Sequence, residues 1–394
     1  MNTRTILFTL LCICLVHKAN AQCGFTGDTL VVNTVDELVA LTGCDTIYGS
    51  LLIHQWDISD LEPLASLTYV EEHFILSENI SLLNINDLSN LVTVGGNLEF
   101  KSNFTLASLN GLESLSHLGG NLALEGNITL QEIDAFSGLT QILGDLIIAE
   151  NHVVGNLGGL QNIESVEGNI VLSPQNLVLS DLSGLNALVS VEGAFFVSLP
   201  ALTTLTGLES LNYVGGDFEL KSMDLLANAD ELVSLMAVEG TLSIHNNSSL
   251  VNVNGLESLE SIGQNLAIHD NPALAMCCGI LPVISENGVV GEVTLVNNNS
   301  GCNEVEEIEL ACAEFVEDIQ NLELEFICNS SKRQIRFRTN DNAVYYLWSL
   351  SGAEMERGVC TPFESSVINL PQSGLHGLSV HSGKDVIVRR FAVY

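Results

Sequence analysis

Two histidines, His245 and His269, come closest in type and spacing to a metal site. Their positions differ by one period of a repeat that is about 24 residues long. If one period makes one structural turn, the two imidazoles lie about 5 Å apart on adjacent turns. That spacing suits a metal ion, but no third ligand is obvious. Two exposed histidines beside Asn246 and Asp270 are therefore the favoured interpretation, and we predict no metal. Both histidines remain candidate ligand-binding residues.

Carboxylates are the second candidate for chemistry, because a glycosidase needs two of them facing each other across a sugar. Glu99 and Glu219 take outward positions and Glu125 lies just past a predicted strand, but these residues belong to distant repeats. A lyase acting on acidic sugars would also need clustered Lys or Arg, which the repeats lack. The sequence contains no nucleophile elbow, zinc-protease motif, P-loop or EF-hand loop. We therefore predict no catalytic residue and no enzyme activity.

The same repeat, about 24 residues long, covers most of the chain. Three segments show it: Asn110–Leu122 (NGLESLSHLGGNL), Thr206–Phe218 (TGLESLNYVGGDF) and Asn254–Leu266 (NGLESLESIGQNL). Their starting positions are separated by four periods and by two periods. A fixed period in this range indicates a solenoid, whose long surface suits binding better than a single catalytic cleft.

Each repeat contains a short apolar-x-apolar pattern, which predicts a half-buried strand. The first apolar residues form a column: Leu51, Phe74, Leu98, Leu122, Leu146, Ile170, Phe195, Phe218, Leu242, Leu266 and Val293. We predict that these strands stack into one parallel sheet about 50 Å long, at roughly 4.8 Å per strand. The predicted fold class is all-β, a parallel β-helix or solenoid of about 11 turns followed by a small β-sandwich.

The residues between the two buried ones face outward from the predicted sheet. This outward column is Leu52, Ile75, Glu99, Ala123, Ile147, Val171, Phe196, Glu219, Ser243, Ala267 and Thr294. Ile147, Val171 and Phe196 follow one another and would form an apolar stripe. A contiguous exposed apolar patch often marks an interaction site, so these three are candidate ligand-binding residues. The alternative is that a loop or the C-terminal domain covers them.

An asparagine recurs at a fixed distance after the first column. Its positions are Asn79, Asn103, Asn127, Asn151, Asn247, Asn271 and Asn298, with Asn176 one residue late. At a fixed corner, Asn can bond backbone groups of its own turn and of the next. The pattern fails at Pro200 and Asp224. Five of the seven N-x-[ST] sequons fall on these asparagines, and we interpret them as by-products of the repeat rather than glycan acceptors.

Two further patterns complete the repeat. Apolar residues three positions apart, as at Leu106, Leu109, Leu112, Leu115 and Leu118, are expected to fill the inside of the coil. Gly-Gly pairs at 95–96, 119–120 and 215–216 precede the strands. We expect these glycines to allow a sharp turn into the strand.

The formal net charge of −36 excludes several kinds of partner. From residue 22 to residue 320 only Lys101 and Lys221 are basic, whereas acidic residues occur throughout. Such a surface repels the phosphates of nucleic acids and anionic membranes. We predict no cofactor, with calcium on the acidic surface as the single ion considered.

Residues 1–21 have the pattern of a secretory signal peptide: Arg4, an apolar stretch at Ile6–Val16 and a small-x-small cleavage site at Ala19–Ala21. The apolar stretch is too short to span a bilayer, and no later segment resembles a membrane span. The remaining cysteines are Cys23, Cys44, Cys277, Cys278, Cys302, Cys312, Cys328 and Cys360. An even number in an exported chain favours disulfides. We predict a secreted or outer-surface location.

The aligned columns resemble those of the receptor L-domain-like repeats, a right-handed leucine-rich β-helix, over roughly Thr29–Ala313. In that family a disulfide typically closes the N-terminal turn, which implies that Cys23 pairs with Cys44. The later cysteines resemble the family's C-terminal cap. Adjacent cysteines rarely bond each other, so Cys277 and Cys278 are expected to pair with Cys302 and Cys312, in either arrangement.

After Cys312 the composition changes. Residues 314–325 are acidic and predict a linker or capping helix, and basic residues appear from residue 326 on. Strand-like runs lie at Gln334–Thr339, Ala343–Leu350, Val367–Leu370 and Asp385–Tyr394. With the segments YYLWSLSG and VIVRR, they resemble the C-terminal sorting domain of type IX secretion substrates, a small β-sandwich ending in a basic strand. The predicted domains are 1–21 (signal peptide), 22–313 (solenoid with disulfide caps), 314–325 (linker) and 326–394 (sorting domain).

Together these observations predict a non-catalytic binding or adhesion protein. The L-domain resemblance implies that its partner is a protein or a carbohydrate, recognised on the sheet face or its rim. One alternative is a structural envelope or matrix component with calcium-bridged acidic surfaces. The other is a carbohydrate-active β-helix enzyme, which would need two carboxylates about 5–10 Å apart on one face.

Overall fold

A computed structural model of the chain describes residues 21–312 and, beyond them, the segments 325–329, 334–338, 343–349, 354–360, 365–369, 374–382 and 385–393. The chain divides into two compact units, Met1–Ala311 and Cys312–Tyr394. The predicted signal peptide lies outside the described residues except for Ala21, and the predicted linker except for Glu325. In the part of the chain that is described, no helix is long and apolar enough to cross a membrane.

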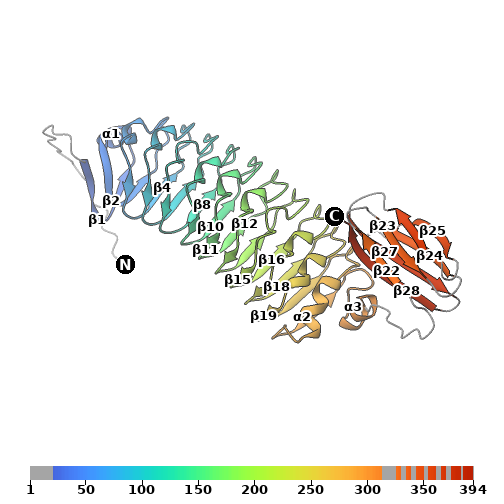
Figure 1. Cartoon of the computed structure of the whole chain (residues 1–394). Coiled ribbons are helices and arrows are strands. Elements are labelled where there is room, and N and C mark those ends of the chain that lie inside the picture. The colour runs from blue at the N-terminus through green and yellow to red at the C-terminus, as the bar shows by residue number, and fades with distance from the viewer. Residues whose placement is uncertain are drawn as a thin grey trace. The chain divides into compact units, whose positions relative to one another are not determined.

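The first unit is a parallel β-solenoid built on one long sheet (Figure 1). Its main strands are β2 (Cys44–Ile53), β4 (Phe74–Ser77), β6 (Leu98–Lys101), β8 (Leu122–Glu125), β10 (Leu146–Ala149), β12 (Ile170–Leu172), β14 (Phe195–Val197), β16 (Phe218–Lys221), β18 (Leu242–His245), β20 (Leu266–His269) and β21 (Val293–Val296). The predicted first column is in register, since Leu146 pairs with Leu122 on one side and with Ile170 on the other. The predicted fold class is confirmed.

Other elements of the coil were not predicted from the sequence. β1 (Ala21–Val32) pairs in parallel with β2 at the N-terminal end. Two-residue strands precede the main ones: β3 (Tyr69–Val70), β5 (Thr93–Val94) and β7 (His117–Leu118) join the long sheet. A second, six-stranded sheet contains β9 (Gln141–Ile142), β11 (Ser165–Val166), β13 (Ser190–Val191), β15 (Tyr213–Val214), β17 (Ala237–Val238) and β19 (Ser261–Ile262).

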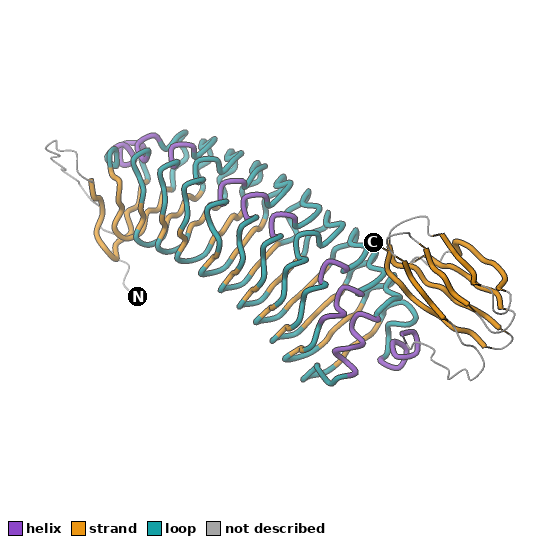
Figure 2. The backbone as a smooth tube through the Cα atoms, viewed as in Figure 1, coloured by secondary structure: helices purple, strands orange, loops and turns teal. Residues whose placement is uncertain are grey.

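Short helices complete the turns, and Figure 2 shows strand, loop and helical turn alternating along the coil. The 3-10 helices are η1 (Glu62–Leu64), η2 (Asn86–Leu88), η3 (Asp134–Phe136), η4 (Gly158–Leu160), η5 (Ser183–Leu185), η6 (Asp230–Leu232), η7 (Asn254–Ser258) and η8 (Cys278–Ile280). The α-helices are α1 (Val35–Val39) near the start, and α2 (Leu281–Ser285) and α3 (Val305–Cys312) near the end. All are short, so the coil is held by contacts between successive turns rather than by helix stability.

Apolar side chains from every side fill the inside of the coil. The leucines spaced three residues apart are buried, as predicted, at positions 106, 109, 112, 115 and 118. The largest buried side chains include Phe195 and Phe218 on neighbouring strands, whose rings stack with centroids 5.3 Å apart. Each fully buried Leu or Phe contributes about 1.5–3 kcal/mol to the stability of the fold. The apolar side chains inside the coil are therefore the main source of the solenoid's stability.

A buried ladder of asparagines runs along the corner that follows the strands, as predicted. At Asn103, the side-chain Oδ1 accepts the backbone N–H of Asn79 at 3.2 Å, and Nδ2 donates to the Leu76 carbonyl oxygen at 2.9 Å. The arrangement recurs from Asn79 to Asn176 and from Asn247 to Asn298. The ladder asparagines from Asn79 to Asn271 have no exposed surface, which supports treating their sequons as by-products of the repeat.

The gap in the ladder involves other residues than those predicted. Leu199 and Met223 occupy the corner and are fully buried, whereas Pro200 and Asp224 lie beside them and are exposed. An apolar side chain fills the corner but cannot bond the neighbouring turn. The ladder resumes where the N–H of Met223 donates to Asn247 Oδ1 at 2.9 Å.

The Gly-Gly pairs have a different role from the predicted one. None of their glycines has a positive φ. Instead, a Cβ on Gly95, Gly119 or Gly215 would overlap a backbone carbonyl oxygen of the preceding turn. These glycines therefore permit close approach between turns. The left-handed residue lies after the strand, directly before the corner asparagine, as at Glu78 (φ 55°).

A second polar column, not predicted, precedes most of the main strands. The side chains of His73, Asn97, Asn121, Asp145, Asn169, Asp217 and Asn265 each accept a backbone N–H from the next turn. At Asp145, Oδ1 accepts from the N–H of Asn169 at 2.7 Å. The signal was present in the sequence as an Asn or Asp directly before the first apolar column.

Disulfides close both ends of the solenoid. Cys23 bonds Cys44, joining β1 to β2. Cys277 bonds Cys302, which resolves the arrangement left open by the sequence for this pair. The remaining two cap cysteines, at positions 278 and 312, are disulfide-bonded as well.

The second unit contains two antiparallel sheets. One holds β22 (Glu325–Asn329), β23 (Gln334–Arg338) and β26 (Ser365–Asn369), and the other holds β24 (Ala343–Ser349), β25 (Glu354–Cys360), β27 (Gly374–Ser382) and β28 (Asp385–Val393). The four predicted runs coincide with β23, β24, β26 and β28, while β22, β25 and β27 were missed. Cys328 and Cys360 lie on β22 and β25, in different sheets.

Replacing Asn127 by Ala should destabilise the solenoid strongly. The change removes the acceptor for the N–H of Asn103 (3.0 Å) and the donor to the Phe100 carbonyl oxygen (2.8 Å), both inside the coil. Leaving two buried backbone groups without partners should lower the free energy of unfolding by about 2–4 kcal/mol, as measured by urea denaturation. The control is Asn162→Ala, an exposed Asn that donates to the Ser137 carbonyl oxygen. Equal effects of the two changes would contradict the ladder's role.

Replacing Gly168 by Ala should also be destabilising. Its Cβ would lie 2.6 Å from the Gly144 carbonyl carbon, so successive turns must separate. We expect a loss of about 1–3 kcal/mol in urea unfolding, as for other overpacked sites. Gly155→Ala is the matched control, because its Cβ would meet nothing within 4 Å. That variant should be neutral or stabilised by under about 1 kcal/mol, and a larger loss there than at Gly168 would refute the close-approach explanation.

Candidate functional site

The predicted apolar stripe is continuous on the outer face of the long sheet. Ile147 of β10 pairs with Val171 of β12, which in turn pairs with Phe196 of β14. Their strand neighbours, such as Leu146 and Ile148, are fully buried, so the three stripe residues point away from the core. All three are half-buried. Half-buried side chains on paired, neighbouring strands form a continuous and rigid apolar surface.

His245 and His269 lie side by side on the same face of the sheet. Each is two residues further along its strand than the residue of the outward column. They are directly paired residues of β18 and β20. Their rings stack with centroids 4.8 Å apart and planes 20° apart, close to the spacing expected from the repeat. The side chain of His245 is only 11% exposed, whereas that of His269 is 29% exposed. His269 is therefore the more accessible of the two.

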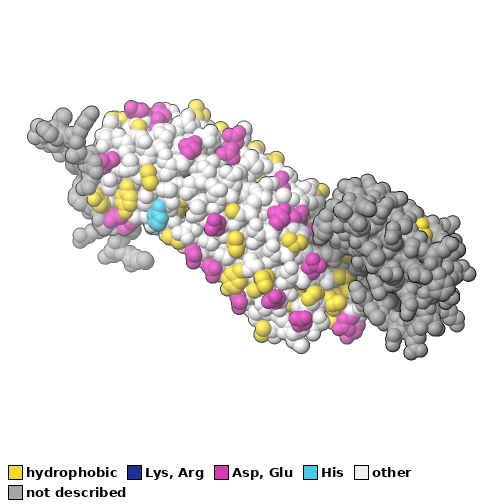
Figure 3. Space-filling model, viewed as in Figure 1, with side chains coloured by type: hydrophobic (Ala, Val, Ile, Leu, Met, Phe, Trp, Pro, Cys, Tyr) yellow, Lys and Arg dark blue, Asp and Glu magenta, His cyan; other side chains and the backbone are white. Residues whose placement is uncertain are grey.

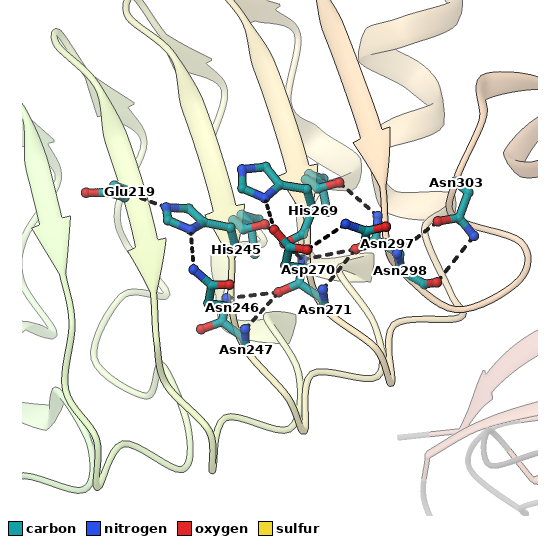
Figure 4. A network of polar contacts seen from close by, with 12 residues as sticks. Glu219, His245, Asn246, Asn247, His269, Asp270, Asn271, Asn297, Asn298 and Asn303 are labelled. Atoms are coloured by element: carbon teal, nitrogen blue, oxygen red, sulfur yellow. Dashed lines mark hydrogen bonds and ion pairs between the residues drawn. The ribbon is translucent and has the colours of Figure 1, made fainter.

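Hydrogen bonds fix the tautomer of both rings (Figure 4). His245 Nε2 lies 2.8 Å from Glu219 Oε1, and its Nδ1 lies 3.0 Å from the Asn246 side-chain amide. A neutral ring with its proton on Nε2 satisfies both contacts, as donor to the carboxylate and acceptor from the amide. His269 Nδ1 lies 2.8 Å from Asp270 Oδ2, and this contact requires a proton on Nδ1, because a carboxylate only accepts.

Asp270 is held in its ionised form by this network. Hydrogen bonds from His269 and then from Asn297, whose Nδ2 lies 2.8 Å from Asp270 Oδ1, hold the pKa of this carboxyl below its usual value. A carboxyl with a lowered pKa stabilises the folded state above its unfolded pKa and loses that contribution as the pH falls through the folded pKa. The stabilisation that comes from the ionised Asp270 is therefore present at neutral pH and is lost in acid.

Glu219 connects the stripe to the histidines. It follows Phe196 in the outward column, paired across β14 and β16, and its carboxylate bonds His245 in the neighbouring column. The five candidate residues therefore lie on one face of six consecutive main strands, β10 to β20, with Glu219 between the apolar and polar parts. The sequence placed Glu219 in the right column but gave no sign of this connecting role.

The other two carboxylates considered for catalysis, Glu99 and Glu125, lie on the adjacent strands β6 and β8 rather than on distant turns as the sequence suggested, and they form an ion-pair cluster. Lys101 Nζ lies 2.8 Å from Glu99 Oε2 and 3.4 Å from Glu125 Oε1. Burial pushes the pKa of Glu99 up, but hydrogen bonds from Lys101 and Asn97 outweigh it and hold that pKa below its usual value. A glycosidase acid needs the opposite shift. The cluster is therefore better suited to holding the strands' outer face together than to proton transfer.

Among the described residues, no group of three or more His, Cys, Asp or Glu residues is arranged to hold a metal ion. His54 and His73 lie on other turns: His54 Nδ1 contacts Ser77 Oγ at 3.2 Å, and His73 Nδ1 accepts the N–H of Asn97 at 2.9 Å.

One exposed feature was missed from the sequence. The residue directly after the corner position is apolar on most of the first turns, with His152 as the exception: Trp56, Ile80, Phe104, Ile128 and Leu177. We call these five residues the corner ridge. Trp56, Ile80 and Phe104, with Glu78 and Ser102, line one surface depression of about 310 Å³. The sequence contains this feature as a further column of residues, one position after the corner asparagines.

Comparison of the sequence with models of known protein families finds no match, and no curated protein matches it either. A functional proposal for this chain therefore depends on its surface geometry and on the sequence patterns described above.

The pKa of Asp270 should rise toward its usual value when His269 is replaced by Gln. The change replaces the imidazole that accounts for the largest part of the lowered pKa. A carbon-13 NMR titration of the Asp270 carboxyl in the two proteins measures this directly. His152→Gln, on a distant turn, is the control and should leave the titration unchanged. An unchanged Asp270 titration in the His269 variant would rule out the hydrogen bond as the cause.

Proposed function

We propose that this chain is a secreted or cell-surface binding protein that recognises a protein or carbohydrate ligand on its sheet face and catalyses no reaction. The observation that carries the proposal is the continuous surface from Ile147 through Phe196 and Glu219 to His269. It combines an apolar stripe with hydrogen-bonding groups fixed in orientation. Interfaces in general have this composition, an apolar centre beside polar groups.

Rigidity supports the same proposal. The surface belongs to consecutive strands of one sheet, and the polar side chains are already held by partners before any ligand arrives, as His245 is by Glu219. Binding to such a surface loses little side-chain entropy, which increases affinity for a given contact area. The aromatic Phe196 at the centre has the character of an interface anchor.

The cellular location and export route are part of the proposal. Disulfides at both ends of the solenoid are compatible with an oxidising, extracellular setting. The N-terminal signal pattern and the resemblance of the last residues to type IX sorting domains support export to the outer surface. The receptor L-domain resemblance supports recognition as the purpose of the repeats.

The test is a binding screen of the full chain against glycan arrays and cell surfaces, with Phe196→Glu beside the unmodified protein. A charge at the end of the apolar stripe, which a bound ligand would cover, should weaken binding by at least about tenfold. Thr294→Glu is the matched control, because Thr294 is exposed at the far end of the same outward column. It should bind normally. Binding that survives Phe196→Glu would remove the sheet face as the site, and no binding to any surface would contradict the proposal.

A further inference from the structure

The corner ridge is a second exposed surface, separate from the sheet face. Its residues follow the corner positions, whose backbones are tied turn to turn: the N–H of Gln55 donates to Asn79 Oδ1, and the N–H of Asn79 donates to Asn103 Oδ1. Thr105 and Thr129 reinforce the stack, donating to the carbonyl oxygens of Ile80 and Phe104. The ridge side chains are therefore held in one row, about 4.8 Å apart from turn to turn.

The ridge is exposed to a degree that is unusual for large apolar side chains. Trp56 is 62% exposed, Phe104 43% and Leu177 51%. The half-buried His152 interrupts the row between Ile128 and Leu177. Further along the coil, proline or a small polar residue occupies the same position: Pro200, Asp224, Ser248, Pro272 and Asn299. The local backbone is alike at Phe104 and Asp224, since the residue two positions earlier has φ 55° in both cases, at Ser102 and Ser222, so the repeat itself does not require an apolar residue here. The row is unbroken from Trp56 to Ile128, and a contiguous exposed apolar row of this kind often marks an interaction surface.

The charges around the ridge restrict its partner. Glu78 lines the same depression as Trp56 and has a side chain that is 58% exposed, and Glu150 is exposed beside the ladder further along. Lys101, the nearest lysine on the turns that carry the ridge, is already paired with two carboxylates. Figure 3 shows acidic side chains spread among apolar ones along the visible face of the solenoid. A partner that brings positive charge is attracted, whereas an acidic partner or an anionic membrane is repelled.

The spacing of the ridge restricts the partner's conformation. From Trp56 to Leu177 there are five steps of about 4.8 Å, or roughly 24 Å. An α-helix lying along the ridge presents one apolar side chain per turn of about 5.4 Å, and about 16 residues cover roughly 24 Å. An extended strand presents side chains on a given face at intervals of about 6.8 Å, which fall out of step with the ridge after two turns. The helix therefore matches the ridge more closely.

We propose that the corner ridge binds a basic amphipathic helix of about 16–18 residues from a partner protein. The apolar face of that helix packs along Trp56, Ile80, Phe104 and Ile128, and its Lys or Arg residues reach Glu78 and Glu150 on the flanks. Binding there does not depend on the sheet face.

The probe is a labelled 18-residue peptide with Leu on one helical face and Lys elsewhere. A second peptide has the same composition with the leucines spread around the helix, and a third replaces Lys by Glu. Each is titrated against the full chain by fluorescence anisotropy, with tryptophan emission recorded in parallel. The amphipathic basic peptide should bind at least about tenfold more tightly than either of the others, with a blue shift in emission that is absent in Trp56→Ser.

Variants locate the site. Phe104→Ser should weaken binding of the basic amphipathic peptide by about tenfold. Leu225→Ser, at a somewhat more exposed apolar residue on a turn without the ridge, should change it by less than about twofold. Phe196→Glu should leave it unchanged, which separates this surface from the sheet face. All of these residues except Phe196 are exposed, so the variants should fold, and thermal melting confirms this.

Several results would overturn the proposal. Equal binding of the two basic peptides would mean that charge alone attracts them. Binding insensitive to Phe104→Ser would place the site elsewhere. Sedimentation of the chain with neutral lipid vesicles but no peptide binding would identify the ridge as a lipid contact instead.

Discussion

The structure depends on hydrogen bonds that a single turn cannot make for itself. At the corner after most of the main strands, the backbone N–H of one turn is satisfied by the asparagine side chain of the next turn, as at Asn79 and Asn103. A second set before the strands acts in the same way, as at Asp145 and Asn169. Because unpaired buried backbone groups are strongly unfavourable, each turn must lie at hydrogen-bonding distance from its neighbours.

This constraint turns repeated sequence positions into continuous surfaces. Once the turns are locked in register, a single outward position becomes the stripe of Ile147, Val171 and Phe196, and another becomes the corner ridge. The two turns that lack a ladder asparagine, with Leu199 and Met223 at the corner, are those that carry Phe196 and Glu219. The ladder is thus interrupted where the apolar part of the sheet face meets its polar part.

Most of the solenoid could be predicted from the sequence because its information is periodic. The eleven strands, their register, the buried leucines and the asparagine corner all follow from residue type at fixed spacing. The role of the glycines could not be predicted from the sequence. They permit close approach between turns, and that depends on backbone positions that only the folded coil defines. The hydrogen bond between Glu219 and His245 was not predicted, because the two residues hold different positions in the repeat. The periodic pattern relates only residues that hold the same position.

The core and the surface of this fold are under different constraints. An inward position such as Leu220 contacts the turns on both sides, so a change there disturbs three turns at once. An outward position has no such requirement, as the corner column shows by changing from Phe104 to Asp224 on an unchanged backbone. Binding surfaces can therefore differ along one solenoid while its architecture stays fixed. At the corner ridge proposed above, the acidic charge of the coil favours a basic partner over an acidic one.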